Sequence, residues 1–126
     1  MEDKVIPELV GTALTLMKKE YAHFSGVEEL AQRLSVSKEH LVRSFRAATS
    51  ETPGHCLTRI RLENACRYLQ SRDYSVELVA GLCGFACGNY FCKVFRRAYG
   101  MTPLEYRALN WNENTEPPEN ERSTFV

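Results

Sequence analysis

The chain has 126 residues, 44% of them hydrophobic and 25% charged, a composition that is ordinary for a soluble globular protein. A chain of this length buries enough apolar surface to fold without metals or disulfides, and the lack of a signal peptide or a bilayer-length apolar run predicts a cytoplasmic protein. The net charge of zero does not exclude a polyanionic partner, because residues 30–109 carry 12 basic and 6 acidic side chains while both ends are acidic.

Three helices are predicted in the first half of the chain. Apolar side chains recur at helical spacing over residues 5–22, where Pro7 is tolerated in the first turn. Ser25 and Glu28 match a capping box and predict the start of a second helix, and Ser37 predicts the start of a third. The side chains expected to be buried are Val5, Ile6, Leu9, Val10, Ala13, Leu16, Met17, Val27, Leu30, Ala31, Leu34, Leu41, Phe45 and Ala48.

Four more helices are predicted after residue 50. Thr52–Pro53 opens a long helix to about residue 70, and Ser75 opens a shorter helix that Gly84 ends. A further helix ends at Gly100, and Thr102–Pro103 begins the last, which reaches about residue 109. The side chains expected to be buried are Leu57, Ile60, Leu62, Ala65, Leu69, Val76, Val79, Ala80, Cys83, Phe91, Val94, Phe95 and Ala98, with Trp111 packed on the last helix beside Tyr106 and Leu109.

These elements predict an all-α fold of seven helices, because no stretch alternates with a period of two. We expect a first helix-turn-helix subdomain over residues 1–52 and a connecting helix over 53–71. A second helix-turn-helix subdomain is expected over 72–109. The polar, acidic segment 110–126 has no period and contains prolines, so we expect it to be disordered.

An internal repeat supports this division. Residues 30–36 match 79–85 at an offset of 49, and after one extra residue 41–53 match 91–103 at an offset of 50. The later pairs are Leu41/Phe91, Arg43/Lys93, Phe45/Phe95, Arg46/Arg96, Ala48/Ala98, Thr52/Thr102 and Pro53/Pro103. The sequence therefore contains one helix–turn–helix–cap unit twice.

The second helix of each unit, near residues 37–48 and 87–98, has a basic face opposite its apolar stripe. Basic faces are usually only solvated, but two helices that are basic at matching positions favour a shared ligand. Arg and Lys pair with guanine, and Asn pairs with adenine, in the major groove of DNA. The pattern therefore predicts a sequence-specific double-stranded DNA-binding protein.

The segment from Gly84 to Arg107 resembles the signature of the AraC/XylS family of transcription regulators. The motif is Gly84-Phe85-x4-Tyr90-Phe91-x3-Phe95-Arg96-Arg97-x2-Gly100-Met101-Thr102-Pro103-x2-Tyr106-Arg107, and residues 30–53 resemble the first unit of that family. The resemblance covers roughly residues 5–108. It implies two three-helix lobes on a long connecting helix, recognition helices that enter successive major-groove segments, and RNA polymerase as a partner. It also implies that a separate effector or dimerisation domain accompanies this unit in many members.

The resemblance also assigns roles to residues of both recognition helices. Two features depart from the family pattern: Gly88 has no side chain to read a base, and Cys87 and Cys92 stand where polar residues are common. Glu39 is unusual beside phosphates, although its carboxylate can accept from cytosine. The implied base-reading residues are Glu39, Val42, Arg43, Gly88, Asn89, Cys92 and Lys93, and the implied phosphate contacts are Ser37, Lys38, His40, Arg46, Arg96 and Arg97.

Other readings of the sequence are less favoured. The fold could serve as a protein-interaction module that has lost base readout, which Gly88 and the neutral net charge would support. The five cysteines include no Cys-x2-Cys pair, so metal binding or thiol sensing is a third reading, and we expect reduced thiols and neither a metal nor a cofactor. No acid/base or nucleophile constellation is recognisable, so we do not expect an enzyme.

Overall fold

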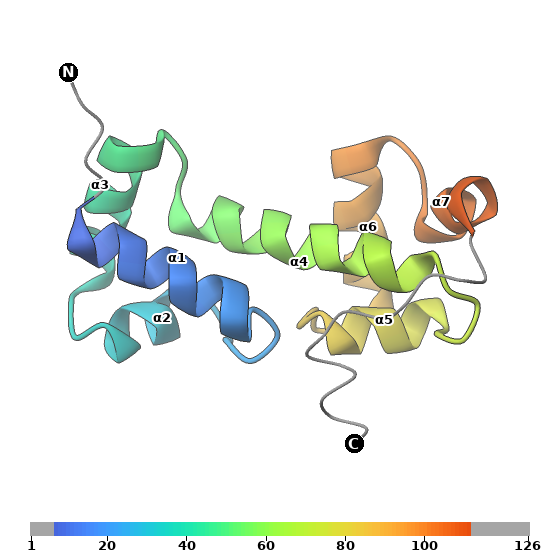
Figure 1. Cartoon of the computed structure of the whole chain (residues 1–126), viewed down its shortest axis with the longest axis horizontal. Helices are drawn as coiled ribbons and strands as arrows, with labels where there is room; N and C mark the ends of the chain where they lie inside the picture. The colour runs from blue at the N-terminus through green and yellow to red at the C-terminus, as the bar shows by residue number, and fades with distance from the viewer. Residues whose placement is uncertain (1–6, 112–126) are drawn as a thin grey trace. The chain divides into compact units, whose positions relative to one another are not determined.

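The computed structural model describes residues 7–111, which contain seven α-helices and no strand (Figure 1). The predicted all-α fold is therefore confirmed. Val5, Ile6 and residues 112–126 of the predicted disordered tail lie outside the described residues. No helix of the described part is long and apolar enough to cross a membrane. The helices are α1 Glu8–Glu20, α2 Val27–Arg33, α3 Lys38–Thr49, α4 Pro53–Leu69, α5 Val76–Leu82, α6 Gly88–Tyr99 and α7 Pro103–Asn110.

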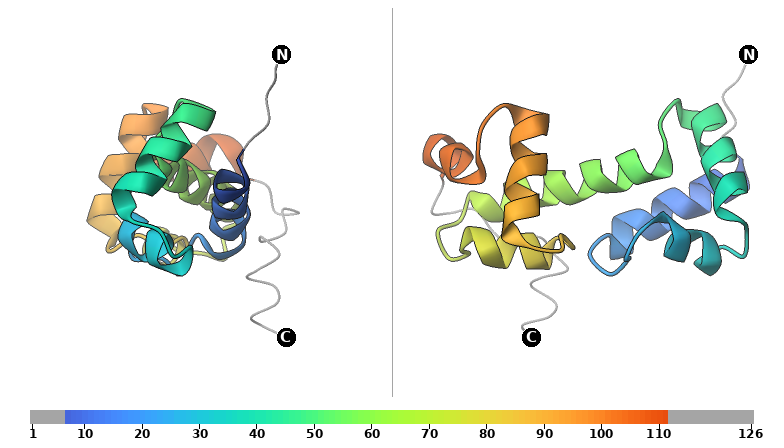
Figure 2. Two further views of the ribbon diagram at one scale, coloured as in Figure 1. Left: turned by 90° about the vertical axis from the view of Figure 1, so that its left-hand side faces the viewer. Right: turned by 180° about the vertical axis from the view of Figure 1, so that it is seen from behind.

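The chain divides into two compact units within α4, between Ile60 and Arg61. In the first unit, α3 packs against both α1 and α2, as the different views agree (Figures 1 and 2). Phe45 and Leu41 of α3 are fully buried there. The first unit is therefore a three-helix core around α3, closed by the start of α4.

In the second unit, α6 packs against α5 and α7. Its core is aromatic: the ring of Phe91 lies 4.9 Å from that of Phe85 and 5.7 Å from that of Phe95. The Phe95 ring also meets the Tyr106 ring edge-on at 5.6 Å. Each such pair adds about 0.5–1.5 kcal/mol beyond the area that it buries.

Arg107 fixes α7 to the far end of α4. Its Nε donates to the carbonyl oxygen of Leu69 at 2.8 Å, and its guanidinium also donates to the carbonyl oxygen of Tyr74. The last carbonyls of an α-helix have no partner within the helix, so this side chain satisfies one of them. Partial burial lowers the pKa of Arg107, but an arginine stays charged in proteins.

Most predicted helix starts are confirmed by their hydrogen bonds. The hydroxyl of Ser37 accepts from the backbone of His40, and that of Ser75 accepts from the backbone of Leu78, both at 3.0 Å. The Thr52 hydroxyl accepts in the same way from the third helical residue of α4 at 3.1 Å. At α7, Thr102 and Glu105 form a complete capping box.

The capping box predicted at the start of α2 names the wrong glutamate. The carboxylate that accepts from the backbone and hydroxyl of Ser25, at 2.9 and 3.0 Å, belongs to Glu29 and not to Glu28. These hydrogen bonds lower the pKa of Glu29. Helix α2 begins at Val27, one residue later than a Ser25 cap requires, and Gly26 is its N-cap.

Two predicted core positions are also wrong, and six others are only half-buried: Leu9, Leu16, Val27, Leu34, Val76 and Val94. Ala48 and Ala98 are exposed, because each lies about 60° around its helix from the buried phenylalanine three residues earlier, at the edge of the apolar stripe. Leu109 is 74% exposed. Trp111 contacts the second unit through Arg72, whose guanidinium lies 4.2 Å from the indole centroid.

Candidate nucleic-acid interface

The turn between the two helices of each unit is held by equivalent backbone hydrogen bonds. In the first unit the amide of Val36 donates to the carbonyl of Ala31 at 3.1 Å, and in the second the amide of Phe85 donates to the carbonyl of Ala80 at 2.9 Å. These pairs have the offset of 49 that relates the two sequence segments. The repeat is therefore a repeat of backbone geometry, and it presents α3 and α6 as equivalent helices.

Both units use the left-handed backbone conformation at the same two places. The turn residue is Ser35 in the first unit, with φ of 61°, and Gly84 in the second, with φ of 92°. The residue that ends the second helix is Ser50, with φ of 64°, and Gly100, with φ of 75°. A left-handed residue at a helix end redirects the chain and lets its amide reach an unpaired carbonyl, here that of Arg46 or Arg96.

The outer face of α3 brings the predicted residues of the first unit together. Lys38, Glu39, Val42, Arg43 and Arg46 line one open concave surface along the helix. All are exposed except Val42, which is half-buried. His40 and Ser37 are exposed at the start of the helix, where the Ser37 hydroxyl is engaged by the backbone of His40.

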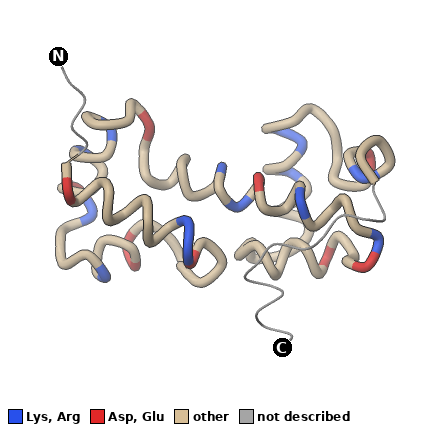
Figure 3. The backbone as a smooth tube through the Cα atoms, in the orientation of Figure 1, with Lys and Arg blue, Asp and Glu red and all other residues tan. Residues whose placement is uncertain are grey.

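The outer face of α6 is basic as well. Asn89, Lys93, Arg96 and Arg97 are exposed, and Cys92 is half-buried. In Figure 3, Lys and Arg positions occur along both α3 and α6. Arg43 and Lys93, and likewise Arg46 and Arg96, keep their equivalence on the two exposed faces.

Gly88 does not lie on the exposed face of α6, contrary to expectation. It is buried, because the side chain of Glu77 in α5 lies over it. A β-carbon added at Gly88 would lie 2.5 Å from Oε1 of Glu77 and 3.0 Å from its carboxyl carbon. The equivalent position of α3 is Lys38, which is exposed.

Helices α3 and α6 also start differently. Cys87 is the N-cap of α6 and makes no side-chain capping bond, whereas Ser37 caps α3. A carboxylate near a helix N-terminus interacts favourably with the helix dipole. Glu77 therefore supplies negative charge to a helix start that its own N-cap residue leaves without a bond.

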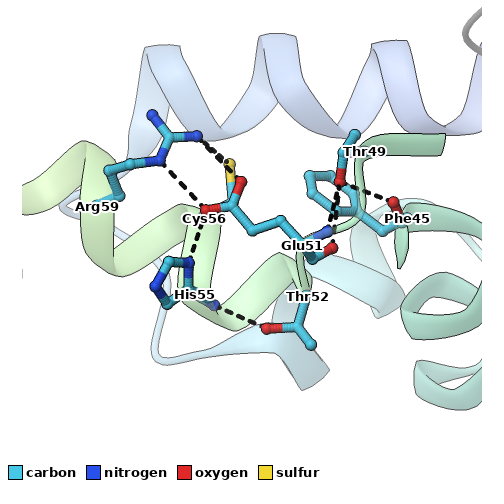
Figure 4. A network of polar contacts seen from close by, with 7 residues as sticks. All are labelled: Phe45, Thr49, Glu51, Thr52, His55, Cys56 and Arg59. Atoms are coloured by element: carbon cyan, nitrogen blue, oxygen red, sulfur yellow. Dashed lines mark hydrogen bonds and ion pairs between the residues drawn. The ribbon is translucent and has the colours of Figure 1, made fainter. Parts of the chain in front are cut away.

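A polar network joins the end of α3 to the start of α4 (Figure 4). The Glu51 carboxylate accepts from Nε and Nη2 of Arg59 at 3.2 and 3.1 Å, and it lies 2.6 Å from Nδ1 of His55. The bonds from Arg59, more than those from His55, lower the pKa of Glu51. The Thr49 hydroxyl donates to the carbonyl of Phe45 at 2.8 Å, so the network holds the last turn of α3 in place.

The cysteines play no visible part in a metal site. All five are free thiols, and no group of three or more His, Cys, Asp or Glu within residues 7–111 is placed to hold a metal ion. Burial raises the pKa of Cys83 to about 12. Cys66 hydrogen-bonds with Tyr99 and Tyr106, and burial raises the pKa of its thiol as well.

Sequence reasoning missed one exposed residue of α6. Tyr90 is 53% exposed in the first turn of this helix, directly beside Asn89. Tyr90 was included only as part of the family signature and was given no role, whereas its neighbour Phe91 was predicted to be buried. The unequal exposure of two adjacent aromatics follows from the helical period, which places them about 100° apart.

Comparison with known proteins identifies the family of the chain. A helix-turn-helix domain family matches residues 30–109. The chain is 36% identical over 91 residues to the transcriptional activator RhaS of Escherichia fergusonii, covering 72% of this chain and 33% of RhaS. It is 33% identical over 105 residues to the activator RhaR of Enterobacter sp., covering 83% and 34%. The chain spans about a third of the length of the curated relatives it matches.

Solved structures share the fold. The C-terminal domain of AraT, a response regulator from Geobacillus stearothermophilus, matches with a TM-score of 0.80 and 26% identity, covering 92% of this chain and 98% of that one. The DNA-binding domain of AdpA, a global transcriptional factor solved in complex with a target DNA, matches with a TM-score of 0.72 and 34% identity. That match covers 82% of this chain and 93% of the AdpA domain.

Proposed function

Because this chain belongs to the AraC family of helix-turn-helix transcription regulators, we propose that it binds double-stranded DNA sequence-specifically through α3 and α6. The observation that carries this proposal is two pairs of equivalent basic positions, Arg43 with Lys93 and Arg46 with Arg96, exposed on two helices that follow turns with equivalent backbone hydrogen bonds. The major groove of a duplex faces the same side once per helical turn. Two equivalent DNA-reading helices therefore suit a site with two half-sites about one turn apart.

The base-reading roles fall to exposed or half-exposed residues near the start of each recognition helix, which reach the base edges. Arg43 and Lys93 carry the largest share, because a cationic side chain pairs with guanine O6 and N7, and Asn89 pairs with adenine. Gly88 is left out, since it has no side chain and Glu77 covers it. The reading set is Glu39, Val42 and Arg43 in α3, and Asn89, Cys92 and Lys93 in α6.

Phosphate contacts come from the rims of both faces. Lys38, His40 and Arg46 flank the reading residues of α3, and Arg96 and Arg97 flank those of α6. The Ser37 hydroxyl is already occupied by the amide of His40, so its phosphate role is limited to its remaining donor hydrogen. Each phosphate neutralised releases counterions, so binding should weaken steeply with salt.

The test is selection from a randomised duplex pool of about 25 base pairs, sized for two half-sites, followed by salt-titrated anisotropy on the selected duplex. We expect Arg43→Ala to lose about 1–3 kcal/mol of specific binding and to relax preference at one position. Lys93→Ala should act in the same way on the other half-site. Lys18→Ala removes the same charge from an exposed position of α1 and serves as the matched control.

If no sequence is enriched and binding is weak even at low salt, the base-readout proposal fails. The fold would then serve as a protein-interaction module. As a regulator bound at a promoter in the cytoplasm, the protein would recruit or block RNA polymerase. Transcription in vitro from a template carrying the selected site, compared with one carrying a scrambled site, tests this step.

A further inference from the structure

Tyr90 is the most exposed aromatic side chain among residues 7–111, at 53%. The other aromatics of the second unit are at most 38% exposed and pack into or against its core. A tyrosine ring left in solvent gains nothing from burial, whereas a rigid ring held at a surface provides contact area with little loss of conformational freedom on binding. The position of this ring on α6 therefore determines which part of a bound partner it can contact.

The helical period places Tyr90 on the strip that faces outward. At about 100° per residue, Tyr90 lies about 60° from Lys93 and about 20° from Arg97, and Asn89 lies about 40° to the other side of Lys93. All four of these residues are exposed. Gly88 lies about 140° from Lys93, on the flank that Glu77 covers.

The exposed strip of α6 therefore comprises different helix positions from the exposed strip of α3. On α3, the residue equivalent to Gly88 is the exposed Lys38, so that flank is open there. On α6 the same flank is closed, and the available surface shifts toward Tyr90 and Arg97. The first turn of α6 thus offers two side chains to a partner, Asn89 and Tyr90.

The ring of Tyr90 is held from below. Its centroid lies 6.3 Å from that of Phe85, which is buried and in turn lies 4.9 Å from the fully buried ring of Phe91. A reading side chain that rests on core side chains is positioned before its ligand arrives. The contact with Phe85 thus fixes the orientation of the whole Tyr90 ring, including its apolar edge.

From these observations we propose that Tyr90 is a specificity-determining residue of the second unit, whose ring contacts the 5-methyl group of a thymine in the major groove. The inference rests on the proposed DNA-binding function and deepens it. Thymine carries the apolar methyl group of the major-groove edge, so it is the base that an aromatic ring selects. Asn89 and Lys93 beside it would read neighbouring bases by hydrogen bonding.

The experiment uses the selected duplex with each thymine replaced in turn by deoxyuridine, which removes only the methyl group. With the wild-type chain, one such replacement in the half-site that Lys93→Ala identifies should weaken binding about four-fold, as expected for losing the burial of one methyl group. Tyr90→Ala should bind the thymine and deoxyuridine duplexes equally. Tyr90→Phe keeps the ring and should keep the four-fold difference.

Two further variants keep the test decisive. Leu104→Ala removes an apolar side chain that is 65% exposed on α7 and should leave the thymine-to-uridine ratio unchanged. Tyr90→His gives α6 the residue type that α3 carries at the equivalent position, and it covers the case in which Tyr90→Ala does not fold. Like Tyr90→Ala, it should abolish the ratio.

Two results would overturn the inference while the proposed function stands. In one, no thymine of this half-site responds in the wild-type chain. In the other, Tyr90→Ala weakens selected and scrambled duplexes by the same factor, which is the behaviour of a backbone contact. If the wild-type chain selects no sequence at all, the proposed function itself fails, and that result is visible before any Tyr90 variant is made.

Discussion

In the first unit, serines occupy the two left-handed positions of the helix-turn-helix repeat, whereas in the second unit both are glycines. Ser35 and Ser50 hold φ values of 61° and 64° at the places where Gly84 and Gly100 hold 92° and 75°. Glycine adopts this region freely, while a side chain there costs about 1–2 kcal/mol. The first unit therefore tolerates a strain that the second avoids.

The starts of the recognition helices show the opposite preference. The first unit has a serine cap with a 3.0 Å bond, and the second has a cysteine that makes none. The backbone hydrogen bonds of the two turns are nevertheless equivalent. The comparison teaches that the repeat conserves the backbone path. The first unit has strained serines at its left-handed positions, and the second has a recognition helix without a side-chain cap.

The largest effects are expected at the left-handed helix ends. Gly100→Ala should destabilise the protein by about 1–2 kcal/mol, because an added β-carbon meets no neighbour and only the backbone conformation is penalised. Ser50→Gly should stabilise it by about 0.5–1 kcal/mol, the strain relieved being partly offset by the greater freedom of an unfolded glycine. Urea denaturation measures both. Equal effects of the same sign would show that the two ends do not differ as described.

The helix caps should give a smaller contrast. Ser37→Ala should cost about 1 kcal/mol, since it leaves the His40 amide without its acceptor, and Cys87→Ala should cost almost nothing. Cys87→Ser is expected to stabilise the second unit by at most about 1 kcal/mol. Thermal unfolding of the three variants tests the contrast, and a Cys87→Ala loss as large as that of Ser37→Ala would contradict it.

The smallest effect, and the only one that should depend on acid, concerns Glu51. The equivalent residue of the second unit is Met101, so this carboxylate distinguishes the first unit. Its pKa is lowered chiefly by Arg59, so the ionised form is favoured in the folded state. Its contribution is therefore complete above the ordinary pKa of a glutamate, about 4.3, and is lost as the pH falls through the lower folded value.

Glu51→Gln should accordingly destabilise the protein by about 0.5–1 kcal/mol at pH 7, because the Arg59 side chain is 47% exposed and solvent screens the pair. The difference from the wild type should shrink toward zero below about pH 4. Urea titrations at several pH values provide the measurement, and Glu28→Gln, at an exposed carboxylate of α2, is the matched control. A difference that is constant with pH would exclude the ion pair as its cause.

The sequence predicted the helices well because their ends carry local signals. Ser37, Thr52, Ser75 and Thr102 act on backbone amides three residues away, and such short-range bonds depend little on the rest of the fold. The start of α2 was less clear, since Glu28 and Glu29 are both within reach of Ser25. Periodicity alone also placed Ala48 and Ala98 inside, because a small side chain at the edge of an apolar stripe carries no signal of its own.

The exposure of a candidate interface residue was predicted correctly where it depends on its own helix alone. It was predicted wrongly for Gly88, where it depends on a side chain of a second helix. Arg43 and Lys93 are exposed because each lies opposite its own buried stripe, which the helical period gives directly. The cover over Gly88 comes from Glu77, eleven positions earlier and on another helix, and no spacing rule relates them. The exposure of Tyr90 follows from the helical period, which places it about 100° from the buried Phe91, but two adjacent aromatics cannot be told apart by residue type.

The bonds made by Arg107 have a consequence for how the protein emerges from the ribosome. This side chain closes the second unit by reaching back 38 and 33 positions, to carbonyls at the end of α4 and beyond it. Translation adds about 5–20 residues per second, so those carbonyls have no Arg107 partner until the later part of the chain has been synthesised. The first unit makes its own contacts earlier, so we expect vectorial folding in which the second unit, closed by α7, is the last to become fixed.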